Sequence, residues 1–112
     1  MNHEVVSLVK KLVESLVAND IDGLVRRGEN GRLSKEEIVN TVKDYPGEIS
    51  LPPDEAYSNA VEYAIYDKKL EARKVEFDLW FDGYVSDLTL SVDVRKGGFG
   101  NFVISIDDIH VL

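Results

Sequence analysis

Hydrophobic and polar residues alternate almost without interruption from Val75 to Val94. Successive side chains of a strand point to opposite faces of a sheet, so this stretch predicts a hairpin with one apolar and one polar face. We expect the apolar face to carry Val75, Phe77, Leu79, Phe81, Leu88, Leu90, Val92 and Val94. The polar face is expected to carry Glu76, Asp78, Trp80, Asp82, Asp87, Thr89, Ser91 and Asp93. Alternating apolar positions in residues 102–106 predict a third strand of the same meander.

The N-terminal part of the chain follows a helical period instead. Apolar residues spaced three and four apart over residues 5–17 predict an amphipathic helix that ends near Ala18. A short second helix is predicted over residues 21–27, because Gly28 is the residue type favoured just past a helix end.

A third helix has the clearest start signal in the chain. Ser34 and Glu37 have the spacing of a capping box, and the helix is predicted to run to about Asp44, before Pro46 and Gly47. Downstream, the pattern predicts three short elements: a strand at residues 49–51, a helical turn at 54–60 and a strand at 61–66.

The register of the hairpin depends on its turn, and two alternatives are open. A type I′ turn at residues 82–83, the preferred Asp-Gly dipeptide, would place Asp78 opposite Asp87, which is an unfavourable like-charge pair. A two-residue loop at 83–84 would instead place Asp78 opposite Thr89 and relieve that repulsion.

In the last predicted strand, the side chains that point to the apolar face change from even-numbered to odd-numbered positions. Its apolar positions switch from even to odd numbers, at Phe102, Ile104 and Ile106 and then at Ile109 and Val111. One extra residue restores the facing, so we expect a β-bulge near residues 107–108.

Composition and charge limit the classes of function. The 112 residues predict a single domain, 1–112, and the absence of cysteine excludes disulfides and thiolate sites. No apolar run approaches the ~18 residues of a membrane helix, and the N-terminus does not resemble a signal peptide, so we expect a cytoplasmic protein without a membrane partner. A formal net charge of −8 disfavours nucleic acid as a partner.

The acidic residues are also concentrated locally. Residues 75–94 contain five acids and no lysine or arginine. Net charge acts first on solubility, but a concentrated acidic face also steers basic proteins toward it. A basic protein is therefore the expected partner.

The order of elements resembles a known architecture. Helices followed by a long antiparallel meander are typical of cystatin-like and NTF2-like proteins, so the resemblance implies an α+β fold with N-terminal helices packed on a curved antiparallel sheet. The chain also resembles a family of small bacterial proteins without an established activity, through residues 33–37, 51–56, 77–80, 86–90 and 106–112. Small acidic proteins of this type recur as immunity proteins of bacterial toxin systems, so the resemblance implies that role.

The candidate partner-binding residues lie on and around the acidic hairpin. Trp80 falls on the acidic face by alternation, where it would serve as the aromatic anchor of a binding surface. The alternative is a core tryptophan covered by a loop or by the strand at 61–66. The full candidate set is Glu76, Asp78, Trp80, Asp82, Tyr84, Asp87 and Asp93.

No complete catalytic motif is present in the sequence. His110 is expected on the polar face of the last strand, near Asp107 or Asp108, but a single histidine without a placed partner is a weak signal. His3 is expected at a mobile terminus. Calcium usually takes 6–8 oxygen ligands, which a flat strand face rarely supplies. We therefore predict no catalytic residues, no metal site and no cofactor.

Two hypotheses of different classes follow. The first is a non-catalytic binding protein, most concretely an acidic immunity protein that occludes the active site of a basic, nuclease-like toxin. The alternative is an NTF2-like small-molecule-binding protein or enzyme, with a pocket between the first helix and the sheet lined by Tyr57, Tyr63 and a titratable group. A homodimer formed through one sheet face is compatible with either.

Overall fold

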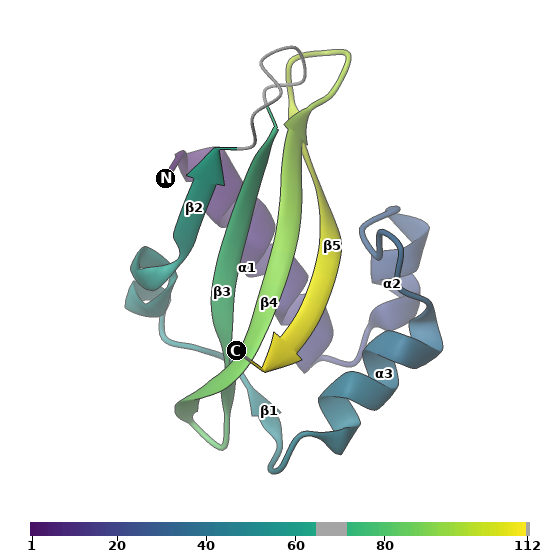
Figure 1. The fold of residues 1–112 in the computed structure, drawn as a ribbon, viewed down its shortest axis with the longest axis vertical. Helices are drawn as coiled ribbons and strands as arrows, with labels where there is room; N and C mark the ends of the chain where they lie inside the picture. Colours follow the sequence, from purple (N-terminus) through teal and green to yellow (C-terminus); the bar gives the residue numbers. More distant parts are fainter. Residues whose placement is uncertain (65–71, 112) are drawn as a thin grey trace.

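The computed structural model describes residues 1–64 and 72–111, and it has the predicted α+β architecture, with helices followed by an open antiparallel sheet (Figure 1). The predicted strand at 61–66 is confirmed up to residue 64; positions 65 and 66 lie outside the described residues. The elements in chain order are α1 (His3–Val17), α2 (Ile21–Arg26), α3 (Lys35–Asp44), β1 (Ile49–Ser50), the 3₁₀-helix η1 (Asp54–Asn59), β2 (Val61–Ala64), β3 (Arg73–Phe81), β4 (Tyr84–Lys96) and β5 (Phe102–Val111).

The helix ends follow the local signals in the sequence. Both hydrogen bonds of the predicted capping box are formed, because the Ser34 hydroxyl accepts from the Glu37 N–H and the Glu37 carboxylate accepts from the Ser34 N–H. Gly28 follows α2 with a left-handed φ of 72°, as expected after a helix end. None of the described helices is both long and apolar enough to cross a membrane.

The sheet has the strand order β1-β3-β4-β5, and β2 pairs with β3 as well. Because β4 occupies one edge of β3, the two short strands β1 and β2 share its other edge, with η1 between them along the chain. Figure 1 shows α1 running behind the sheet, so one sheet face is covered and the other faces solvent. We call these the inner and the outer face.

The inner face and α1 enclose a filled hydrophobic core. The buried residues of α1 lie at helical spacing, and Leu12 is completely buried. Val75, Leu79 and Leu90, which point inward from β3 and β4, are also completely buried. The predicted apolar face of the hairpin is therefore confirmed, and its side chains occupy the space between α1 and the sheet.

The β3–β4 hairpin combines parts of the two predicted alternatives. Asp82 and Gly83 have φ values of 53° and 80°, the left-handed conformation of a two-residue type I′ turn. The predicted consequence of that turn, Asp78 opposite Asp87, is wrong, because Asp78 pairs with Thr89. A register shift between Asp78 and Trp80 separates the turn from the long part of the ladder.

Ser86 stabilises this irregularity. Between the paired positions, Leu79 is the single β3 residue opposite residues 86–88 of β4. The Ser86 hydroxyl donates to the Leu79 carbonyl at 2.6 Å and accepts from the Leu88 N–H at 3.2 Å. The resulting register lets the Thr89 hydroxyl donate to Asp78 at 2.8 Å, in place of a carboxylate repulsion.

The predicted bulge in β5 is confirmed. Ser91 pairs with Asp108 while Val92 pairs with Ile106, so Asp107 is the extra residue. Its carboxylate accepts a hydrogen bond from the Lys74 ammonium at 2.8 Å. This contact lowers the pKa of Asp107 below its usual value, and it raises the pKa of Lys74.

The loop between α2 and α3 contacts the edge of β5 that is not paired with β4. The Ile106 N–H donates to the Glu29 carbonyl at 2.7 Å, and Arg32 Nε donates to the Asp107 carbonyl at 3.0 Å. Gly31 lies between these contacts with a φ of 57°. A Cβ atom at Gly31 would lie 2.0 Å from the Ile106 carbonyl oxygen, so only glycine fits here without displacement.

The Asp107–Lys74 contact predicts a specific dependence of stability on pH. Because the folded-state pKa of Asp107 is lowered, its contribution is present above the unfolded-state pKa and is lost as the pH falls through the folded-state value. We expect Asp107→Asn to lower the free energy of unfolding at neutral pH and to match the wild type more closely at about pH 3. Urea unfolding at both pH values measures this.

Lys74→Gln is the matched variant, because it removes the same contact from the other side. Like Asp107→Asn, it is expected to make the free energy of unfolding depend less on pH in the acidic range. A wild-type slope in both variants would mean that this contact does not contribute to acid unfolding.

Candidate functional site

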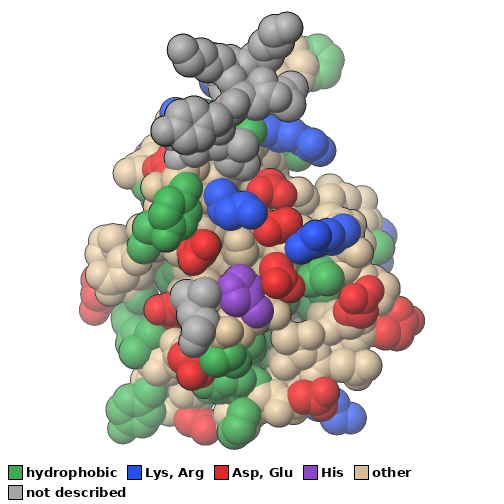
Figure 2. Space-filling view, in the orientation of Figure 1, with side chains coloured by type: hydrophobic (Ala, Val, Ile, Leu, Met, Phe, Trp, Pro, Cys, Tyr) green, Lys and Arg blue, Asp and Glu red, His purple; other side chains and the backbone are tan. Residues whose placement is uncertain are grey.

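The outer face of the sheet carries cross-strand rows of polar side chains. One row joins Asp78, Thr89 and His110, because Thr89 pairs with both of the others. A second row, built in the same way, joins Glu76, Ser91 and Asp108. Figure 2, which shows this face in the orientation of Figure 1, has acidic side chains around a histidine.

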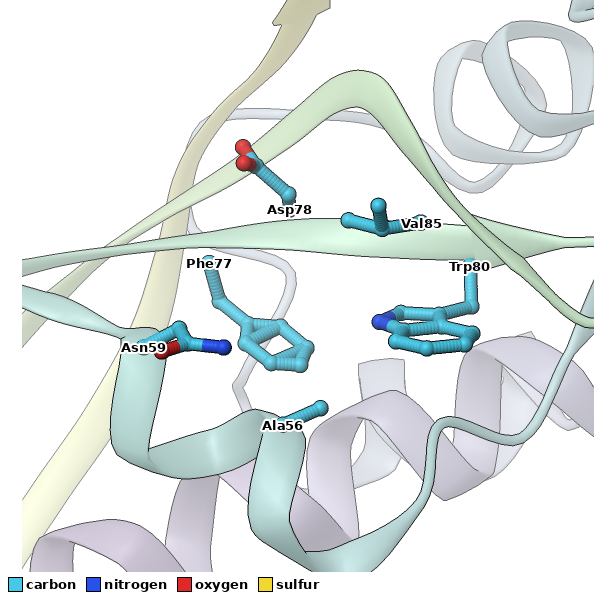
Figure 3. Close-up of a pocket in the computed structure, with 6 residues that line it drawn as sticks. All are labelled: Ala56, Asn59, Phe77, Asp78, Trp80 and Val85. Atoms are coloured by element: carbon cyan, nitrogen blue, oxygen red, sulfur yellow. The ribbon is translucent and has the colours of Figure 1, made fainter.

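The seven predicted site residues lie near one another in sequence but do not all share one surface. Glu76 and Asp78 point outward from β3, and Asp93 points outward from β4. The half-buried Trp80 ring instead lies on the same side as Phe77, toward Ala56 of η1 (Figure 3). Asp82 is the first residue of the two-residue turn, Tyr84 follows the turn, and Asp87 lies in the irregular part of β4. Polar residues therefore alternate with apolar ones along both strands of the hairpin. The register shift, however, leaves Asp87 without a paired residue among the outward side chains of β3.

Two of these acids also connect the hairpin to the segment after α3. The Asp82 carboxylate accepts from the Glu48 N–H at 3.1 Å, and the Asp87 carboxylate accepts from the Tyr45 hydroxyl. The contact with Asp87 raises the pKa of Tyr45. Sequence reasoning gave no sign of these contacts, since they join residues more than thirty positions apart.

Basic residues interrupt the acidic face at the end away from the hairpin turn. Lys74 bonds to Asp107, and Arg32 lies 3.6 Å from the same carboxylate. Arg73 makes an ion pair with Glu62 at 2.8 Å, but Glu62 pairs with the inward Val75, so this ion pair is not part of the acidic face. The part of the face closest to the turn, around Asp78 and Trp80, is where acidic side chains lie without an ion pair among the described residues.

Exposed apolar side chains accompany the acids at that end. Val85 pairs directly with Trp80 and is 60% exposed. Tyr84 is 77% exposed, and Leu51, just after β1, is 60% exposed. Aromatic and apolar groups bordered by charged residues are typical of the energetic centre of a protein interface.

Trp80 combines both predicted environments. It is half-buried, it packs against the core, and it lines a small cavity of about 170 Å³ between β3, β4 and η1 (Figure 3). The 3₁₀-helix covers part of the indole, as the loop-covered alternative predicts. The cavity is lined by Ala56, Asn59, Phe77, Asp78, Trp80 and Val85.

The predicted pocket between α1 and the sheet is not formed by the two tyrosines proposed for it. Tyr57 is buried and stacks on Phe77 with ring centroids 4.8 Å apart, and burial raises the pKa of Tyr57 to about 12. Tyr63 is 48% exposed and pairs with Lys74, an outward residue of β3. The prediction was wrong because Val61 pairs with Glu76, a register that turns Tyr63 to the outer face.

His110 lies beside a carboxylate, as predicted. Its Nδ1 is 3.1 Å from Asp108 Oδ2, whereas Asp107 faces Lys74 instead. His110 also borders an open groove between the end of α3 and the ends of β4 and β5. This groove, of about 580 Å³, is lined by Thr41, Asp44, Tyr45, Pro46, Asp87, Leu88, Ile109, His110 and Val111.

The two histidines lie apart, and the described part of the chain holds no cluster suited to a metal ion. His3 is the exposed first residue of α1, which lies behind the sheet, so it does not join His110 on the outer face. Within residues 1–64 and 72–111, no group of three or more histidine, aspartate or glutamate side chains is placed to hold a metal ion.

The predicted site residues did not include four residues that line the small cavity, Ala56, Asn59, Phe77 and Val85. Val85 carried a signal, because it is an apolar residue beside the polar hairpin turn. Asn59 carried none, because its position beside Trp80 depends on how η1 packs against β3.

Comparison with known proteins gives a family and nothing further. A model described as Domain of unknown function (DUF7668) matches residues 13–112. No curated protein and no solved structure matches the chain. The cystatin-like or NTF2-like assignment therefore stays a prediction, as does the immunity role.

Proposed function

We propose that this chain, which belongs to the DUF7668 family, is a non-catalytic binding protein that inhibits a basic protein. The observation that carries the proposal is the surface around Trp80, where exposed apolar side chains adjoin Asp78 on an open sheet face. The most concrete form is a cytoplasmic immunity protein for a basic, nuclease-like bacterial toxin.

Charge supports a basic partner. The chain has a formal net charge of −8, and its hairpin from 75 to 94 contains five acids without a lysine or arginine. The active site of a nuclease is basic because it holds phosphates. An acidic surface that covers such a site competes for the same lysine and arginine side chains, and its field accelerates encounter.

The packing favours surface binding over chemistry in an interior pocket. Leu12, Leu79 and Leu90 fill the space between α1 and the sheet and are completely buried. The polar groups lie on the outer face, which is open to a large partner (Figure 2). Trp80 would supply short-range contact area, and the carboxylates would set orientation and association rate.

The first test is charge reversal on the outer face. Affinity capture from a bacterial lysate identifies the partner, and the association rate is then measured at low and high salt. Asp78→Lys with Asp93→Lys is expected to slow association by about ten-fold or more at low salt, with a smaller effect at high salt.

Glu14→Lys with Glu36→Lys is the matched control. It makes the same change in net charge at exposed positions on α1 and α3, away from the outer face. Equal rates for the two double variants would contradict the proposed surface. Failure to capture any basic protein at either salt concentration would contradict the proposed class of partner.

A further inference from the structure

The cavity beside Trp80 contains hydrogen-bonding groups that the fold itself leaves unused. Figure 3 shows the side-chain nitrogens of Asn59 and Trp80 pointing toward each other, with the Phe77 ring between them in this view. Neither side chain makes a hydrogen bond within residues 1–64 and 72–111. Two polar groups on separate elements are therefore available to one ligand group placed between them.

The chemistry of the cavity selects a neutral ligand with an acceptor oxygen. The indole N–H of Trp80 can only donate, whereas the Asn59 amide has both donors and an acceptor. The Asp78 carboxylate points away from the two rings (Figure 3), but it borders the cavity in a chain of net charge −8. A bound carboxylate would meet this negative field, so a neutral carbonyl group is favoured.

The apolar part of the lining adds a requirement of shape. Ala56 contributes apolar surface from η1, Phe77 contributes it from β3, and Val85 borders the cavity from β4. At about 170 Å³ the cavity is smaller than the usual ~300–1,000 Å³ of drug-sized ligand sites. Its size suits one small planar group, not a whole cofactor.

We propose that this cavity is a binding site for one neutral carboxamide group. Its carbonyl oxygen accepts from the Trp80 indole N–H, and its N–H donates to the Asn59 side-chain oxygen, with the amide of Asn59 oriented accordingly. The group belongs to the bound protein, either as a glutamine or asparagine side chain or as a peptide bond. In this respect the inference rests on the proposed function and adds a specific anchor to it.

The single tryptophan makes the site directly observable. In the full chain labelled with ¹⁵N, the indole N–H resonance reports on Trp80 alone. Titration with acetamide is expected to shift this resonance in a saturable manner, with equal amounts of sodium acetate and guanidinium chloride giving no saturable shift. N-methylacetamide distinguishes the sources, because binding of both amides indicates a peptide group and binding of acetamide alone indicates a side-chain carboxamide.

Asn59→Ala should abolish the saturable shift, whereas Asn40→Ala, an exposed asparagine on α3, should retain it. A saturable response to acetate or guanidinium instead of acetamide would overturn the proposal, and so would an unchanged acetamide response in Asn59→Ala. These titrations use no protein partner, so a failure here leaves the salt-dependent association test intact.

Discussion

Replacing Gly31 by alanine is expected to lower the free energy of unfolding by about 3 kcal/mol. Gly31 has a φ of 57°, and a left-handed conformation costs roughly 1–2 kcal/mol for a residue with a Cβ. The added Cβ would also lie 2.0 Å from the Ile106 carbonyl oxygen. Because this atom belongs to the backbone of β5, the loop or the strand must move to accommodate it.

Gly28→Ala separates the cost of the left-handed conformation from the cost of the close approach to the β5 backbone. Gly28 has a similar φ of 72°, but a Cβ there would have no atom within 4 Å. This variant is expected to lose only about 1 kcal/mol in urea unfolding. Equal losses in both variants would show that the close approach to β5 contributes nothing.

Ile38→Ala is expected to lower the free energy of unfolding by about 2–4 kcal/mol. Ile38 is completely buried, and it is the one buried residue of α3. Its truncation leaves a cavity where α3 meets the core, so the helix should also open more often. Urea unfolding measures the first effect, and faster amide hydrogen exchange in α3 measures the second.

Asn40→Ala is the control on the same helix. Asn40 is exposed, so this change is expected to alter stability by no more than about 0.5 kcal/mol. If Ile38→Ala leaves hydrogen exchange in α3 at the wild-type rate, the attachment of the helix does not depend on this side chain.

Local patterns predicted most of the fold because each has a local physical cause. The capping box at Ser34 satisfies N–H groups at the start of its own helix, and the parity change around Asp107 follows from the need to keep apolar residues on one face. The hairpin register was only partly predictable. Ser86 stabilises an irregularity through the Leu79 carbonyl, and alternation of residue types does not encode such a contact.

The candidate site was less predictable than the fold. Alternation predicted Trp80 on the same face as Asp78, but it could not show that the indole would lie on the side of Phe77, partly covered by η1. The register of β2 against β3 could not be predicted from the sequence either. This register turns Tyr63 away from the position expected for a pocket residue. Contacts between distant segments decide both features.

The contacts of the α2–α3 loop with β5 also bear on how copies of this protein can associate. An exposed strand edge is a template on which another chain can add a strand. Here the Ile106 N–H and the Asp107 carbonyl, at the middle of that edge, are already occupied by Glu29 and Arg32. A second molecule therefore cannot extend the sheet along the full length of β5, which protects the monomer against fibre-like stacking.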